Sequence, residues 1–128
     1  MQHSRHYTLE EASALVEPLT ELIGRMRSAR DRLGDAEARA ALAAASGSNG
    51  GGEPGRTVSE GFLELRDAMI WLRDREIVLR DLDRGLVDFP ALRDSTEIYL
   101  CWQEGEDEIA FWHGPEAGFA GRRALDDV

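Results

Sequence analysis

The first half of the chain places apolar residues at alternating steps of three and four, the spacing of an amphipathic helix with a heptad seam. The row consists of Ala12, Leu15, Leu19, Leu22, Met26, Ala29, Leu33, Ala36 and Ala40. Thr8 and Glu11 have the spacing of a capping box, which predicts that the helix begins there. We therefore expect one long helix over residues 8–45.

Pro18 interrupts this pattern. It has no amide hydrogen and its ring crowds the carbonyl of Ala14, so we expect a kink or a local break. Before and around this point, Leu9, Val16 and Ile23 add a second apolar row, which makes the N-terminal half of the helix apolar over a wider face.

A second helix follows a segment without apolar residues. Residues 46–56 are rich in Gly and Ser and predict a flexible loop. Thr57 and Glu60 repeat the capping-box spacing, and the apolar period of three and four then continues, which predicts a helix over 57–75. In an antiparallel hairpin the first helix, which is longer, extends beyond the end of the second. Its remaining apolar face must pack on the C-terminal segment or on a second copy of the chain.

After residue 76 the apolar period changes to two, which is typical of strands. Residues 77–82 and 86–89 flank a turn at 83–85 that ends in a glycine suited to the left-handed conformation. Pairing the end of the first strand with the start of the second puts Arg80 opposite Asp88, so we expect a cross-strand ion pair.

A second hairpin is expected between 98–103 and 108–113, with its turn at 105–106. In the register that this turn implies, one face carries Ile98, Leu100, Trp102, Ile109, Phe111 and His113, and the other carries Tyr99, Cys101, Ala110 and Trp112. Cys101 and His113 then lie on opposite faces, which argues against a pair of nucleophile and base.

These elements predict one α+β domain over residues 1–128. A long antiparallel helical hairpin packs on a small antiparallel β-sheet of two hairpins, and residues 118–123 cross the sheet as an ordered tail anchored by Phe119.

Composition narrows the classes of function. The chain has 25 acidic residues, its 15 basic residues are all Arg, and the net charge is −10. The absence of Lys excludes a P-loop or Schiff-base lysine, and the acidic balance disfavours nucleic-acid binding. No apolar run is long enough to span a bilayer, and the N-terminus has no signal-peptide core. With Cys101 as the single cysteine, we expect a cytoplasmic protein with neither membrane nor nucleic acid as partner.

Several segments together resemble a known family. They are residues 7–12, 81–90, 99–102, 112–113 and 118–122. Taken together, they resemble a bacterial family labelled domain of unknown function 2203, over nearly the whole chain. The resemblance implies a small bacterial protein to which no activity is attached. One departure is Glu76, where similar sequences tend to have Gly, so the resemblance does not extend to a tight turn before the first strand.

Residues that could carry chemistry gather in the strand segment. His113 is the leading candidate, because a neutral imidazole serves as a metal ligand or as a general base. The ligand-binding candidates are Asp81, Asp83, Arg84, Asp88, Trp112, His113 and Arg122. For a divalent metal the expected ligands are His113, Asp81 and Asp83, although no zinc or calcium loop spacing is matched. We expect the acidic turn, His113 and the Arg122 tail to converge in one polar pocket.

Two kinds of function remain open. Because the heptad seams are unequal and no catalytic set is complete, we favour a non-enzymatic binding or assembly module that forms a homodimer through the long helix. The alternative is a metal-binding protein or a small metal-dependent enzyme that uses His113 and nearby carboxylates. A purely structural network of ion pairs, with Arg84 and Arg122 bound to Asp88 or Asp81, would explain the same residues. His3 and His6 precede the first cap, and we expect them in a mobile terminus.

Overall fold

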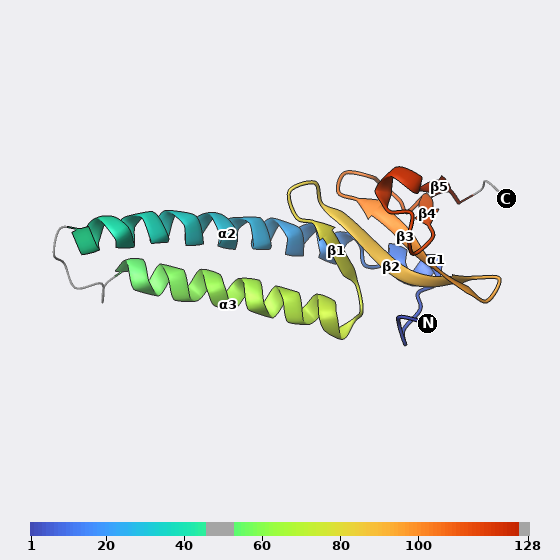
Figure 1. Cartoon of the computed structure of the whole chain (residues 1–128), viewed down its shortest axis with the longest axis horizontal. Coiled ribbons are helices and arrows are strands. Elements are labelled where there is room, and N and C mark those ends of the chain that lie inside the picture. The colour runs from blue at the N-terminus through green and yellow to red at the C-terminus, as the bar shows by residue number, and fades with distance from the viewer. Residues whose placement is uncertain (46–52, 126–128) are drawn as a thin grey trace. The chain divides into compact units, whose positions relative to one another are not determined.

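The computed structural model of the chain describes residues 1–45 and 53–125, with side chains over 1–34 and 60–125 (Figure 1). The chain forms two compact units. One unit consists of Met1–Glu21 and Trp71–Val128 and contains the sheet, and the other is Leu22–Ile70. Each unit is described below by itself.

The first helix begins where the capping box predicts. Helix α1 spans Leu9–Ser13; the Glu11 amide donates to Thr8 Oγ1 at 3.0 Å and the Thr8 amide donates to the Glu11 carboxylate at 2.9 Å. The expected continuous helix over 8–45 is wrong, because the chain turns at residues 14–15 and helix α2 spans Val16–Ala45. This break is the one predicted from Pro18, which cannot donate to the carbonyl four residues earlier.

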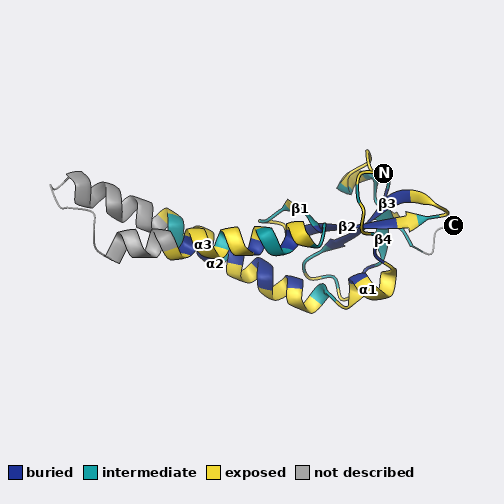
Figure 2. Cartoon of the chain, turned by 90° about the horizontal axis from the view of Figure 1, so that it is seen from below, coloured by how far each residue is buried: buried dark blue, intermediate teal, exposed yellow. Residues whose placement is uncertain are grey.

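Within the unit Leu22–Ile70, helix α2 lies side by side with helix α3, Glu53–Asp74, in antiparallel orientation (Figure 1). Of the predicted seam, Leu22, Met26 and Ala29 are buried and Leu33 is half-buried, and Figure 2 shows buried positions along the described part of α2. The helices approach closely at Gly61, where an added Cβ would lie 3.0 Å from the Ala29 carbonyl oxygen. Arg32 and Glu64 form an ion pair across the two helices.

Helix α3 begins earlier than the sequence pattern indicated. Its first residue is Glu53, so Thr57 lies inside the helix and not at its start. Of the loop expected over 46–56, residues 46–52 lie outside the described residues. Pro54 explains the difference, because proline fits the first turn of a helix, where its missing amide hydrogen has no intrahelical acceptor.

Helix α3 ends in a tight turn at Glu76, despite the absence of glycine there. The Ile77 amide donates to the Leu72 carbonyl at 3.0 Å and the Glu76 amide donates to the Arg73 carbonyl at 3.0 Å. This is the hydrogen-bond pattern of a Schellman motif, and Glu76 occupies its left-handed position with φ 55°. The motif normally takes glycine in this position.

The strands form one sheet of five, with each strand antiparallel to its neighbours and the sheet order following the chain. The elements are β1 Val78–Asp81, β2 Leu86–Arg93, β3 Thr96–Gln103, β4 Phe111–His113, the 3-10 turn η1 Phe119–Gly121, and β5 Arg123–Ala124. The predicted α+β class is therefore confirmed. No helix among the described residues has the length and apolar character that crossing a bilayer would require.

The hairpin between β2 and β3 was not predicted. Its turn consists of Asp94 and Ser95, which have φ values of 50° and 67°. Two successive residues with positive φ are the signature of a type I′ turn, which usually contains glycine or asparagine. The hairpin extends β2 through Pro90, whose carbonyl accepts a hydrogen bond from the Tyr7 amide at 2.7 Å.

The register of the first hairpin differs from the expected one. Leu79 pairs with Val87, and an irregularity between Leu79 and Asp81 brings Asp81 opposite Leu86. The turn takes four residues, 82–85, so the strands meet two positions away from the predicted register. The predicted ion pair nevertheless forms, since Arg80 Nε lies 2.8 Å from Asp88 Oδ2.

The predicted register between β3 and β4 is also wrong, by one residue. Tyr99 pairs with His113 and Cys101 pairs with Phe111. The connection occupies residues 104–110, and β4 begins only at Phe111, so no short turn forces the expected pairing. Because side chains alternate along a strand, a slip of one residue moves His113 to the opposite face. Cys101 and His113 therefore lie on the same face of the sheet.

The two faces of the sheet differ in chemistry. One carries Val87, Phe89, Leu100 and Trp102, all buried, and the Tyr7 ring packs on Phe89 with ring centroids 5.4 Å apart. The opposite face, which we call the polar face, carries the buried side chains of Asp88, Glu97, Tyr99, Cys101 and His113.

Candidate functional site

Three residues with metal-ligand side chains meet on the polar face. Asp88 of β2 pairs directly with Cys101 of β3, and His113 of β4 pairs with Tyr99, two positions before Cys101. One ligand atom from each of Asp88, Cys101 and His113 lies within 4.8 Å of the other two, and each residue is 2% exposed. Among the described residues, this is the group of His, Cys, Asp or Glu side chains that could hold a metal ion.

Both ring nitrogens of His113 face oxygen atoms. Nδ1 lies 2.7 Å from the Gly114 carbonyl oxygen, and Nε2 lies 2.9 Å from Asp88 Oδ2. A carbonyl oxygen only accepts, so Nδ1 carries a hydrogen and donates it. An unprotonated Nε2 would then face the carboxylate with its lone pair, and two acceptors repel each other at this distance. The contact therefore requires a proton, or a cation in its place, between His113 and Asp88.

Arg80 adds a second positive charge to Asp88. Its Nε donates to Oδ2, the same oxygen that faces His113, and its guanidinium lies 5.0 Å from the centroid of the Tyr99 ring. Burial disfavours the charged guanidinium, but the hydrogen bond and the negative charge of Asp88 outweigh this effect and raise the pKa of Arg80. Asp88 is thus the central acceptor of the cluster.

Cys101 is a neutral thiol at neutral pH. Burial is the largest cause that raises its pKa to about 12, and the negative charge of Asp88 acts in the same direction, while the charge of Arg122 opposes both. A thiol in this state is a poor nucleophile. It becomes a thiolate in this setting only when a strong positive charge, such as a metal ion, replaces its proton.

The structure brings two of the predicted site residues, Asp88 and His113, into direct contact. Asp81 accepts a hydrogen bond from the Arg84 amide at 3.1 Å, as in an ordinary turn. Asp81 and Asp83 are not members of the group at Asp88, and their role as metal ligands stays a prediction.

The two remaining predicted residues have partners of their own. Arg122 donates to both carboxylate oxygens of Glu106 at 2.9 Å, in place of the ion pair with Asp88 or Asp81 that we considered, and its guanidinium lies 3.9 Å from the centroid of the Phe111 ring. Trp112 faces the other side of the sheet, where Arg93 stacks on its ring at 4.7 Å.

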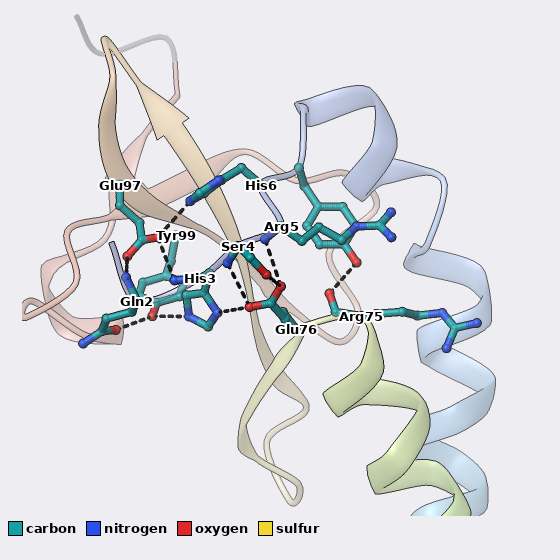
Figure 3. A network of polar contacts seen from close by, with 10 residues as sticks. Gln2, His3, Ser4, Arg5, His6, Arg75, Glu76, Glu97 and Tyr99 are labelled. Atoms are coloured by element: carbon teal, nitrogen blue, oxygen red, sulfur yellow. Dashed lines mark hydrogen bonds and ion pairs between the residues drawn. The ribbon is translucent and has the colours of Figure 1, made fainter.

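The N-terminus is ordered, contrary to the expectation of a mobile segment. His6 Nε2 lies 2.8 Å from Glu97 Oε2, and His3 Nδ1 lies 3.3 Å from Glu76 Oε1 (Figure 3). Sequence reasoning missed Glu97 because the β2–β3 hairpin was not predicted, and it set Cys101 aside because the predicted β3–β4 register placed it on the opposite face from His113. The signal that could have found them is the pair Asp94-Ser95 between two apolar runs, since a two-residue turn there places Asp88 opposite Cys101.

Comparisons with known proteins place the chain in a family without a described activity. Neither the curated proteins nor the solved structures gave a match. A family profile described as an uncharacterized conserved protein, DUF2203, matches residues 5–125, a range that includes Asp88, Cys101 and His113. The resemblance noted in the sequence is thereby confirmed, and the chain belongs to the DUF2203 family.

Proposed function

We propose that the protein binds a divalent metal ion of the zinc type through Asp88, Cys101 and His113. The observation that carries the proposal is the meeting of these side chains, from three adjacent strands, with one ligand atom each within 4.8 Å of the others. Buried cysteine, histidine and carboxylate residues gathered in this way are the ligand types of protein zinc sites.

The chemistry of the ligands selects the metal. Thiolate and imidazole ligands favour zinc and similar transition metals, whereas calcium and magnesium require oxygen ligands. Bonds of about 2.0–2.3 Å in a tetrahedron separate the ligand atoms by roughly 3.5 Å. His113 Nε2 and Asp88 Oδ2, now 2.9 Å apart, would have to separate by a few tenths of an ångström, which small side-chain rotations permit.

Charge balance also supports the proposal. Without metal, the protonated contact between His113 and Asp88, the thiol of Cys101 and the Arg80 cation add up to one positive charge. A divalent ion that replaces the shared proton and the thiol proton leaves the same total. The metal thus exchanges for two protons and places no additional charge in a buried site, so the electrostatic cost of binding is small.

The surroundings of His113 are suited to a ligand. The Gly114 carbonyl holds the Nδ1 hydrogen, which orients the ring and directs Nε2 at the metal position. A backbone carbonyl in this role is a common outer partner of metal-bound histidine. Asp88, Cys101 and His113 supply three ligands, and a water molecule can take the fourth position of a tetrahedral ion.

The test is a titration of untagged protein, reduced and stripped of metal, with cobalt(II) and then zinc(II). Binding of one cobalt ion per chain with a thiolate-to-cobalt charge-transfer absorption, lost on addition of zinc, is the expected result. Asp88→Asn and Cys101→Ala should abolish binding, and Asp107→Asn is the matched carboxylate control that should retain it. Absence of cobalt binding at micromolar concentrations in the wild-type protein would refute the proposal.

A second candidate function is self-association, because helix α3 carries exposed apolar residues at heptad spacing. Phe62 is 59% exposed and Met69 is 61% exposed, and Leu63 beside them is also exposed. We propose that this row of α3 pairs with a second copy of the chain, so that the homodimer forms through α3, whereas the sequence led us to expect it through the long first helix. Sedimentation should show a dimer that Phe62→Glu converts to a monomer and that Asp67→Asn leaves intact. A monomeric wild-type protein would contradict it.

A thiolate ligand also bears on the location of the protein. Cys101 can bind a metal only in its reduced form, and it is the single cysteine of the chain. We therefore propose a reducing compartment, in agreement with the cytoplasmic location expected from the sequence.

A further inference from the structure

Residues 2–6 lie against the polar face of the sheet, and we call them the N-terminal strap. The amides of Gln2 and His3 donate to the Glu97 carboxylate at 2.9 and 3.1 Å, and His6 Nε2 lies 2.8 Å from the same group (Figure 3). One buried carboxylate thus holds three donors of the strap.

Glu76 is the second anchor of the strap. Its carboxylate accepts from the Ser4 amide at 3.1 Å, the Ser4 hydroxyl at 2.8 Å and the Arg5 amide at 2.9 Å. Figure 3 shows these contacts converging on the carboxylate from one side. Glu76, whose backbone has the left-handed conformation after α3, therefore also binds the middle of the strap through its carboxylate.

Tyr99 connects the strap to the candidate metal site. His3 Nε2 lies 2.8 Å from the Tyr99 hydroxyl oxygen, and the two rings meet edge to face. The Tyr99 ring also lies against the His113 ring, with centroids 5.4 Å apart. Glu97, Tyr99 and Cys101 alternate along β3 on the polar face, so the strap covers this face directly beside the site.

The strap is one of two covers beside the site, and its residues Gln2, Ser4 and Arg5 are exposed to solvent. Its contacts with Glu97, Glu76 and Tyr99 are hydrogen bonds between polar groups. On the other side Arg122 stacks on Phe111 at 3.9 Å, and it binds both oxygens of Glu106. Segments with few buried apolar contacts open locally at a lower free energy than the packed body does.

We infer that the N-terminal strap is the gate of the site: release of residues 2–6 from Glu97 and Glu76 admits a metal ion to Asp88, Cys101 and His113. That the species admitted is a metal ion rests on the proposed function. The gate itself can be tested without metal, because Cys101 reports on access to the site.

The experiment measures the rate of alkylation of Cys101 by iodoacetamide, followed by mass spectrometry, in the full-length, metal-free protein. Glu97→Gln leaves one neutral oxygen, in place of two charged ones, for the three donors of the strap. Because charged hydrogen bonds are weakened, the alkylation rate of Cys101 should increase by about 10-fold or more. Glu106→Gln is the matched control on the other cover and should leave the rate within about twofold of the wild type. An unchanged rate in Glu97→Gln, or acceleration by Glu106→Gln alone, overturns the gate.

Global destabilisation must be distinguished from local opening. We therefore measure urea unfolding of each variant: an increase in alkylation no larger than the increase in the globally unfolded fraction overturns the gate, and a larger increase supports it. The cobalt titration separates the two proposals. Faster alkylation in Glu97→Gln without cobalt binding by the wild type refutes the metal site alone, and cobalt binding with unchanged alkylation refutes the gate alone.

Discussion

His113 and Asp88, which are 25 positions apart in sequence, are joined by a contact of 2.9 Å between Nε2 and Oδ2, with both side chains almost fully buried. The contact depends on a proton or a cation, because the Gly114 carbonyl already takes the hydrogen of Nδ1. Arg80 contributes its charge from the exposed side of the same carboxylate. The pair therefore stabilises the fold without metal and offers two ligands to a metal ion.

Asp88→Asn should destabilise the metal-free protein by about 3–5 kcal/mol, because it leaves the charge of Arg80 and the proton of His113 without their carboxylate. Urea unfolding with EDTA present measures the free energy. Asp107→Asn, in the exposed connection after β3, should change it by less than about 0.5 kcal/mol. Equal effects of the two variants would show that the buried pair contributes nothing.

Acid should weaken the attachment of the strap through Glu97. The hydrogen bond from His6 is the largest cause that lowers the pKa of Glu97 to about 2, from an unfolded value of 4.5. A depressed pKa means that this group stabilises the fold fully above pH 4.5, and that its contribution is lost as the pH falls toward 2.

Unfolding free energies measured from pH 6 to about pH 2 check this prediction. Glu97→Gln should flatten the decline over this window, because the substituted side chain has no proton to take up. Glu10→Gln, in an exposed position of α1, is the control and should keep the wild-type slope. An unaltered slope in Glu97→Gln would contradict the role of this carboxylate.

Glu76 combines an unfavourable backbone conformation with a favourable side chain, and a pair of substitutions separates the two. Glu76→Ala and Glu76→Gly both remove the carboxylate that holds the strap, but only alanine retains the cost of a left-handed φ of 55°. Glu76→Gly should be more stable than Glu76→Ala by about 1 kcal/mol in thermal or urea unfolding. Equal stabilities would show that the turn carries no backbone strain.

Gly61 should not tolerate a side chain, although it lies inside a helix. A Cβ at this position would lie 3.0 Å from the Ala29 carbonyl oxygen and 3.2 Å from Leu33 Cγ. Gly61→Ala should therefore lose stability, whereas Gly24→Ala, with open space around its Cβ, should gain up to about 1 kcal/mol from helix propensity. Stabilisation by both substitutions, in the same unfolding assay, would argue against the close approach of α2 and α3.

The sequence alone determined the features that depend on neighbours along the chain. Thr8 and Glu11 cap α1 as expected, the break falls where Pro18 predicts it, and the heptad seam of α2 is buried from Leu22 to Ala29. Caps, proline breaks and apolar periods are local effects of backbone hydrogen bonding and side-chain spacing, so a single stretch of sequence contains them. The α+β class and the Arg80–Asp88 ion pair were also accessible in this way.

Tertiary structure decided the composition of the site. The turn at Asp94 and Ser95 lacks the usual glycine, and without this turn no pattern places Asp88 opposite Cys101. The long connection before β4 leaves its register to contacts across the sheet, and a shift of one residue there moves His113 onto the face of Cys101. Strand register, and the binding of the strap by Glu97 and Glu76, result from contacts between distant segments, which a local pattern does not contain.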